Sequence, residues 1–175
     1  MLNFVVNEIE SYAISNNMRL NPSKCKELSV DFLRHNSCSW QPIAVDGAFI
    51  ERVSCFKLLG VYISEDLSWA SHCDSIIKRA NRRLYALRAL KNCGLPMQDI
   101  LAVYCSLIRS ILEYASIVFV NLPQYLSNAL ENIQKSALGI IVPSMSYSQA
   151  LHLIGLPSLQ EIGRASCRER VCQYV

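Results

Sequence analysis

The segment between His72 and Lys91 concentrates most of the positive charge that could bind a ligand. Asp74 is its only acidic residue, so the segment carries a net charge of +5. Basic residues four positions apart lie on adjacent turns of a helix, where like charges repel unless a polyanion neutralises them. The pattern therefore predicts a phosphate-binding surface or a solvated cationic face, and charge alone does not separate the two. The basic residues are Lys78, Arg79, Arg82, Arg83, Arg88 and Lys91.

Catalytic groups are less evident in the sequence. Phosphoryl transfer with two metal ions needs several carboxylates that converge, and the closest groupings are Glu8 with Glu10 and Glu65 with Asp66. Neither pair follows a convincing apolar strand. No phosphate-binding glycine loop or nucleophile elbow occurs, and no nucleophile accompanies the histidines at 35, 72 and 152. We expect a binding or support domain that holds no metal or cofactor of its own.

Eight cysteines occur at irregular spacing, and none forms a C-x-x-C pair. His35 with Cys38 and His72 with Cys73 are the nearest approaches to a zinc-ligand spacing, and neither supplies four convergent ligands. The sequence also starts directly in an amphipathic pattern rather than in a signal peptide. We therefore expect reduced, mostly buried thiols in an intracellular protein.

Composition indicates a folded chain. Apolar residues make up 51% of the 175 residues and charged residues 18%, which is enough to form a core. Residues 100–120 are long and apolar enough to be compared with a transmembrane span, but Arg109 and Glu113 fall near the middle. Because these two residues are four apart, they can pair on one helix face. We expect a long buried helix and no membrane partner.

The first part of the chain is predicted to contain both helix and strands. Leu2, Val5, Ile9 and Tyr12 have helical spacing over residues 2–16, and residues 28–32 alternate like a half-buried strand. Asp46-Gly47 between two apolar runs predicts a hairpin. Residues 55–63 predict a further strand with a bulge or close backbone approach at Gly60.

Helical spacing replaces alternation after Asp66. Helices are expected from Cys73 to about Lys91, between Pro96 and Pro123, over residues 125–141, and from Ser146 to Leu153. Gly94 is suited to capping the first of these helices, and Pro96 to opening the second. The predicted class is α+β, with a mixed region at 1–65 and an all-helical region at 66–161.

The last residues, 162–175, do not continue the upstream pattern. Ile162-Gly-Arg-Ala-Ser-Cys-Arg-Glu-Arg-Val171 matches the conceptual translation of a widely used short-read sequencing adapter. We therefore expect 162–175 to be an artefact rather than part of the natural chain. Because this tail holds three arginines and one glutamate, the formal net charge is +3 with it and +1 without it.

Several segments together resemble the reverse transcriptase of non-LTR (LINE-like, jockey-type) retrotransposons. Asn17-Met-Arg-Leu-Asn-Pro-Ser-Lys24-Cys25 is similar to palm motif D, and Phe56-Lys-Leu-Leu-Gly60-Val-Tyr-Ile63 to the primer grip. Leu67-Ser-Trp69-Ala-Ser-His72 resembles the opening of the thumb. Leu112-Glu-Tyr114 and Leu130-Glu-Asn-Ile-Gln134-Lys resemble the thumb and connection. The resemblance covers about residues 2–160 in the family's order.

The resemblance implies roles for particular residues. Lys24 corresponds to the motif D lysine, a possible general acid toward the departing pyrophosphate, with Lys26 as the alternative. Phe56, Leu59 and Gly60 would position the 3′ end of the primer. The basic helix would follow the duplex of RNA template and DNA primer. The structural alternative for Lys24 is a surface lysine that follows a turn. The structural alternative for the primer-grip residues is an ordinary buried strand.

The resemblance also has departures. Tyr12 stands where the family usually has tryptophan, and Gly139 where it usually has a basic residue. The family's catalytic aspartates, which bind Mg²⁺, would lie upstream of Met1. The resemblance therefore implies a palm and thumb fragment, inactive alone, whose partners include the missing fingers and palm of the same polyprotein. The rival hypotheses are a non-catalytic nucleic-acid-binding module and a protein-interaction or membrane-associated helical module built on residues 96–121.

Overall fold

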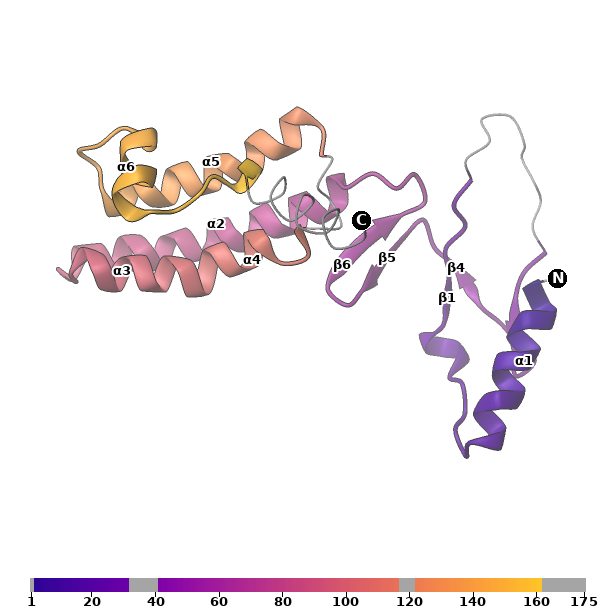
Figure 1. The fold of residues 1–175 in the computed structure, drawn as a ribbon. Helices are drawn as coiled ribbons and strands as arrows, with labels where there is room; N and C mark the ends of the chain where they lie inside the picture. Colours follow the sequence, from indigo (N-terminus) through magenta and orange to yellow (C-terminus); the bar gives the residue numbers. More distant parts are fainter. Residues whose placement is uncertain (1, 32–40, 117–121, 162–175) are drawn as a thin grey trace, which may run out of the picture. The chain divides into compact units, whose positions relative to one another are not determined.

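The structure is a computed structural model that describes residues 2–31, 41–116 and 122–161 (Figure 1). The chain divides into two compact units, Met1–Ser68 and Trp69–Val175. The first unit combines a helix with short strands, and the second is helical over its described residues. The α+β class predicted from the sequence is consistent with this content. The tail 162–175, Phe32, His35 and Cys38 lie outside the described residues.

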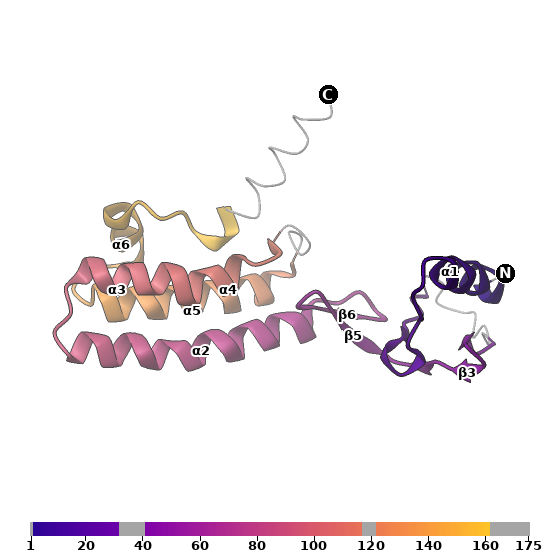
Figure 2. The same ribbon diagram turned by 90° about the horizontal axis from the view of Figure 1, so that it is seen from below.

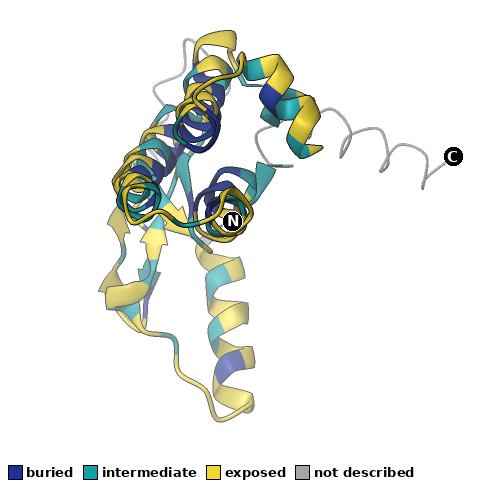
Figure 3. Ribbon diagram, turned by 90° about the vertical axis from the view of Figure 1, so that its left-hand side faces the viewer, coloured by how far each residue is buried: buried dark blue, intermediate teal, exposed yellow. Residues whose placement is uncertain are grey.

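Helix α1 (Leu2–Ser15) opens the first unit, as its spacing predicted. It ends where Asn17 takes a left-handed conformation with a φ of 56°. The helix packs through the side that holds Val6 and Ala13, and from Asn3 to Ser15 only Ala13 is fully buried. The more apolar side, with Ile9 and Tyr12, is exposed, so most of α1 is coloured as exposed in Figure 3.

A short 3₁₀ helix, η1 (Pro22–Lys24), leads into strand β1 (Lys26–Glu27). Strand β1 pairs in parallel with β4 (Glu51–Arg52), and Lys26 forms an ion pair with Glu51. The guanidinium of Arg52 lies 2.6 Å from the carboxylate of Glu27. The expected strand over 28–32 is therefore wrong for residues 28–31, which pair with no strand. Charged side chains, not apolar alternation, hold the actual strand in place.

Two hairpins complete the first unit. Strands β2 (Ala44–Val45) and β3 (Ala48–Phe49) pair across Asp46-Gly47, which confirms the predicted hairpin. Strands β5 (Cys55–Leu58) and β6 (Val61–Ser64) pair across Leu59 and Gly60. The expectation of one strand with a bulge at Gly60 is wrong. Both turn residues have positive φ, 48° and 89°, as a type I′ turn requires.

The second unit is a bundle in which α2, the α3–α4 segment and α5 lie side by side, with α6 packed on α5 (Figure 2). Spacing correctly predicted α2, α5 and α6. Gly94 has a φ of 77° and donates its N–H to the carbonyl of Lys91, which ends α2 as expected. The elements are α2 (Ala70–Asn92), α3 (Met97–Tyr104), the π-helical turn η2 (Cys105–Arg109), α4 (Ser110–Glu113), α5 (Gln124–Ile141) and α6 (Tyr147–Ile154).

The long helix expected between Pro96 and Pro123 is only partly correct. It passes through the π-helical turn η2, and α4 ends at Glu113. Arg109 and Glu113 form the expected ion pair. Among the helices of the described residues, none has the length and apolar character needed to cross a bilayer.

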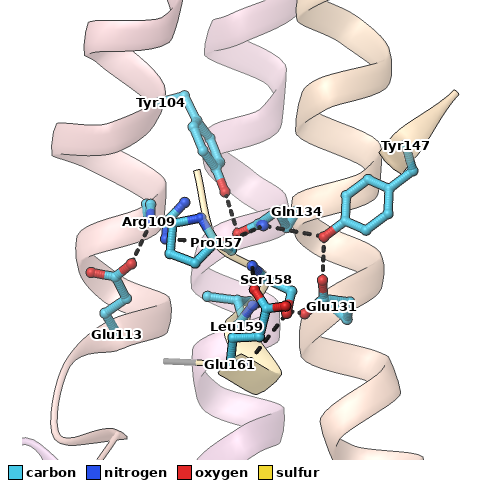
Figure 4. Close-up of polar contacts among 10 residues, drawn as sticks. All are labelled: Tyr104, Arg109, Glu113, Glu131, Gln134, Tyr147, Pro157, Ser158, Leu159 and Glu161. Carbon is cyan, nitrogen blue, oxygen red and sulfur yellow. Dashed lines mark hydrogen bonds and ion pairs between the residues drawn. The ribbon is translucent and has the colours of Figure 1, made fainter. Parts of the chain in front are cut away.

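A buried polar network holds the segment after α6 against the bundle (Figure 4). The side-chain amide of Gln134 donates to the hydroxyl of Tyr147 at 3.1 Å and to the carbonyl of Pro157 at 3.2 Å. Arg109 donates to the same carbonyl at 3.2 Å. The carboxylate of Glu131 accepts from Tyr147 and, at 3.0 Å, from the backbone N–H of Leu159. These bonds satisfy polar groups whose burial would otherwise be costly.

Candidate nucleic-acid interface

Helix α2 has one buried side and one charged side. Its buried side chains form a stripe that packs on the rest of the bundle and includes Cys73, Ile76, Ala80, Leu84 and Leu87. An α-helix has 3.6 residues per turn, so positions 78 and 82 project almost opposite this stripe. Packing of the apolar stripe therefore fixes which direction the charged side faces.

Four of the six predicted basic residues on α2 project into solvent. Lys78, Arg79, Arg82 and Arg88 are all exposed. Within the part of the chain that the structure describes, no carboxylate forms an ion pair with any of them. Asp74 stands one turn before Lys78 and is itself exposed. We call these four residues the cationic face of α2.

The other two basic residues bond to neighbouring helices. Arg83 donates to the carbonyl of Leu107, inside the π-helical turn η2. Lys91 donates to the carbonyl of Ile140, in the last turn of α5, where a cation is also favoured by the helix dipole. Both side chains are only half exposed. Their observed contacts hold the bundle together.

Tyr85 is a member of this surface that the sequence analysis missed. It stands three residues after Arg82 and three before Arg88, and its side chain is 74% exposed. Over the described residues, lysine ammonium groups lie over the rings of Tyr62 and Tyr147, but no such contact covers Tyr85. The spacing could have revealed it, because i and i+3 positions adjoin on a helix.

Two titratable side chains lie at the start of α2, beneath the charged side. Burial, and next the positive charge of Arg79, lower the pKa of His72 below its usual value. Burial, with a smaller effect of the Asp74 carboxylate, raises the pKa of Cys73 to about 11. His72 is therefore neutral and Cys73 a thiol at neutral pH, so neither adds charge to the cationic face.

The residues that resemble a primer grip occupy the β5–β6 hairpin. Phe56 lies in β5 and is half-buried, whereas Leu59 and Gly60 form the turn. The side chain of Leu59 is 83% exposed. Lys57 and Tyr62 are cross-strand partners, with the ammonium 5.4 Å from the ring centre. The hairpin thus presents an apolar tip beside a cation.

The predicted motif D lysine lies on a different element of the first unit. Lys24 is the last residue of η1 and is exposed. Asn21 caps η1, and its side chain accepts from the N–H of Ser23 at 3.0 Å. The alternative, Lys26, is paired with Glu51. Lys24 is therefore the better placed of the two lysines to meet a ligand.

The described residues do not fit a magnesium site. No three histidine, cysteine, aspartate or glutamate side chains among them come together to hold a metal ion. Asp66, one of the carboxylates singled out from the sequence, accepts hydrogen bonds from Ser64 at 2.6 Å and from the N–H of Ser68 at 2.9 Å. These bonds lower its pKa and use it to close a turn. Glu8 and Glu65 are exposed, and Glu10 is half-buried.

No protein-family model, curated protein or solved structure matches this chain.

Proposed function

We propose that this chain binds nucleic acid through the cationic face of α2, as the palm and thumb part of an RNA-directed DNA polymerase of a non-LTR retrotransposon. The observation that carries the proposal is the set of exposed cations without carboxylate partners, Lys78, Arg79, Arg82 and Arg88. Such a surface attracts a polyanion and releases its counterions on binding. In the family that the sequence resembles, the polyanion is the duplex of RNA template and DNA primer. The proposed site of action is inside the cell.

The hairpin and η1 have subordinate roles in this proposal. Phe56, Leu59 and Gly60 would contact the primer end, and Lys24 would stabilise or protonate the leaving pyrophosphate. The Mg²⁺ used in phosphoryl transfer would be held by carboxylates of the parent polymerase. Among the described residues, no three possible metal ligands come together. This chain alone is then expected to bind a primed template without extending it.

The proposal also gives a partner to the exposed side of α1. This side presents Val5, Ile9 and Tyr12, which is more apolar surface than a solvated helix normally shows. We expect the fingers and the rest of the palm to cover it. The same surface is the observation that favours the second candidate, a helical module whose function is protein interaction.

Salt dependence tests the proposal directly. The logarithm of the binding constant for duplex falls with the logarithm of salt concentration, with a slope of about 0.9 for each phosphate contacted. Fluorescence anisotropy with a labelled RNA–DNA duplex measures this slope. Replacing Lys78 and Arg82 with Ala should make the slope shallower by about two.

A matched variant separates a local surface from overall charge. Replacing Arg19 and Lys135 with Ala removes the same two charges from exposed positions outside α2, and it should leave the slope nearly unchanged. Equal effects of the two double variants would show that only net charge matters. Absence of salt-sensitive binding to both duplex and single-stranded nucleic acid by the unmodified chain would reject the proposal and favour the protein-interaction module.

A further inference from the structure

The cationic face of α2 has an aromatic ring at its centre. Tyr85 lies one turn after Arg82 and one turn before Arg88. The helix rises about 1.5 Å per residue, so the two arginines are about 9 Å apart along the axis with the tyrosine midway. No ring contact or hydrogen bond to Tyr85 occurs among the described residues. The ring is 74% exposed and thus accessible to a planar ligand.

The type of nucleic acid that uses such a ring follows from base stacking. In a duplex the faces of each base are covered by the neighbouring base pairs, so an aromatic side chain finds only edges and phosphates. In a single strand a base can leave the stack and lie on the ring, while neighbouring phosphates meet cations on either side. A tyrosine between two arginines has this arrangement of cation, ring and cation.

Comparison with three other tyrosines, the exposed Tyr125 and the half-buried Tyr62 and Tyr147, supports a specific role for this position. Tyr125 on α5 is exposed to a similar extent, 66%, yet no basic residue occurs between positions 121 and 129. Tyr62 and Tyr147 lie near cations, but a lysine lies over each ring. Tyr85 combines an open ring with unpaired cations on the adjacent turns.

We propose that Tyr85 stacks on an unpaired base and makes the cationic face of α2 bind single-stranded nucleic acid in preference to blunt duplex. This inference rests on the proposed nucleic-acid binding and adds the strand state of the ligand. Arg82 and Arg88 would hold the phosphates that flank the stacked base. On a primed template, such a base belongs to the unpaired part of the template strand.

The test compares two labelled probes at matched salt concentrations, a single-stranded 12-nucleotide uridine RNA and a blunt RNA–DNA duplex. Stacking on an aromatic ring is worth about 1–3 kcal/mol per base, which corresponds to about a 5- to 150-fold change in affinity. Tyr85→Ala should therefore weaken single-strand binding about tenfold and duplex binding less than twofold. Tyr85→Phe keeps the ring and should retain the affinity. The salt slope of Tyr85→Ala should equal that of the unmodified chain.

Tyr125→Ala is the matched control, because it removes a similarly exposed ring from a stretch of the chain without basic residues. It should leave both affinities unchanged. If Tyr85→Ala binds the single strand within twofold of the unmodified chain, or loses affinity for both probes equally, the inference is overturned while nucleic-acid binding stands. If the unmodified chain binds neither probe in a salt-sensitive way, the proposed function fails and this inference fails with it. The far-ultraviolet circular dichroism spectrum checks that each variant is folded.

Discussion

The hydroxyl of Tyr104 donates a hydrogen bond of 3.0 Å to the side-chain oxygen of Gln134, and both side chains are completely buried. The bond joins α3 to α5 inside the bundle. Gln134 uses its amide nitrogen for Tyr147 and Pro157, so one buried residue joins four parts of the second unit. Burial raises the pKa of Tyr104, so its hydroxyl remains a donor at neutral pH.

This relationship predicts a clear cost when the donor is removed. Tyr104→Phe leaves the oxygen of Gln134 buried without its partner, which should lower the free energy of unfolding by about 1–3 kcal/mol. Urea denaturation followed by circular dichroism measures the change. Tyr125→Phe removes an exposed hydroxyl and should have no effect. A loss below about 0.5 kcal/mol in Tyr104→Phe would mean that the bond contributes little to stability.

The β5–β6 turn makes a prediction of the opposite sign. Leu59 has a φ of 48°, a conformation that costs most L residues about 1–2 kcal/mol and that asparagine tolerates better. Leu59→Asn should therefore raise the free energy of unfolding of the first unit by about 1 kcal/mol. Gly60→Ala, at a φ of 89°, should lower it. Destabilisation by Leu59→Asn would show that contacts of the leucine side chain outweigh the strain.

The lowered pKa of His72 predicts how the free energy of unfolding depends on pH. Its pKa in the folded chain is lowered from 6.5 by burial and then by Arg79, so the unfolded chain takes up a proton that the folded chain does not. The contribution of His72 to stability is complete above about pH 6.5 and decreases as the pH falls below it, by at most about 1.4 kcal/mol per pH unit. Urea denaturation between pH 5 and 7.5 measures this slope.

A histidine variant tests whether His72 causes this pH dependence of stability. His72→Gln should flatten the dependence over this range, although it lowers stability at pH 7.5 by disturbing a buried position. His152→Gln, at an exposed position on α6, should keep the dependence of the unmodified chain. An unchanged slope in His72→Gln would mean that other groups dominate the titration.

Local sequence signals predicted α2 and α5 well because each of these two helices buries one regular stripe. The stripe of α2 and the capping residue Gly94 were visible as spacing and residue type. The β1–β4 pair was not, because Lys26 and Glu51 are far apart in sequence and carry charges rather than an apolar alternation. The turn at Leu59 was missed since leucine is unusual where φ is positive.

The candidate interface was predicted in composition but not in detail. Sequence alone treated Arg82 and Arg83 alike, yet one is exposed and the other bonds to the carbonyl of Leu107. That carbonyl lies in a π-helical turn, and an apolar segment gives no local sign of where such a turn occurs. Tertiary contacts therefore decide which cations remain available for a ligand.

The segment after α6 is attached through backbone hydrogen bonds as well as through the packed side chains of Leu156 and Leu159. The carbonyl of Pro157 accepts from Arg109 and Gln134, and the N–H of Leu159 donates to Glu131. Backbone groups are the same in every residue type apart from the missing N–H of proline. Natural variation at 157 and 158 is therefore expected to change side chains freely, whereas insertions or deletions there would shift the backbone groups out of register with three buried polar side chains.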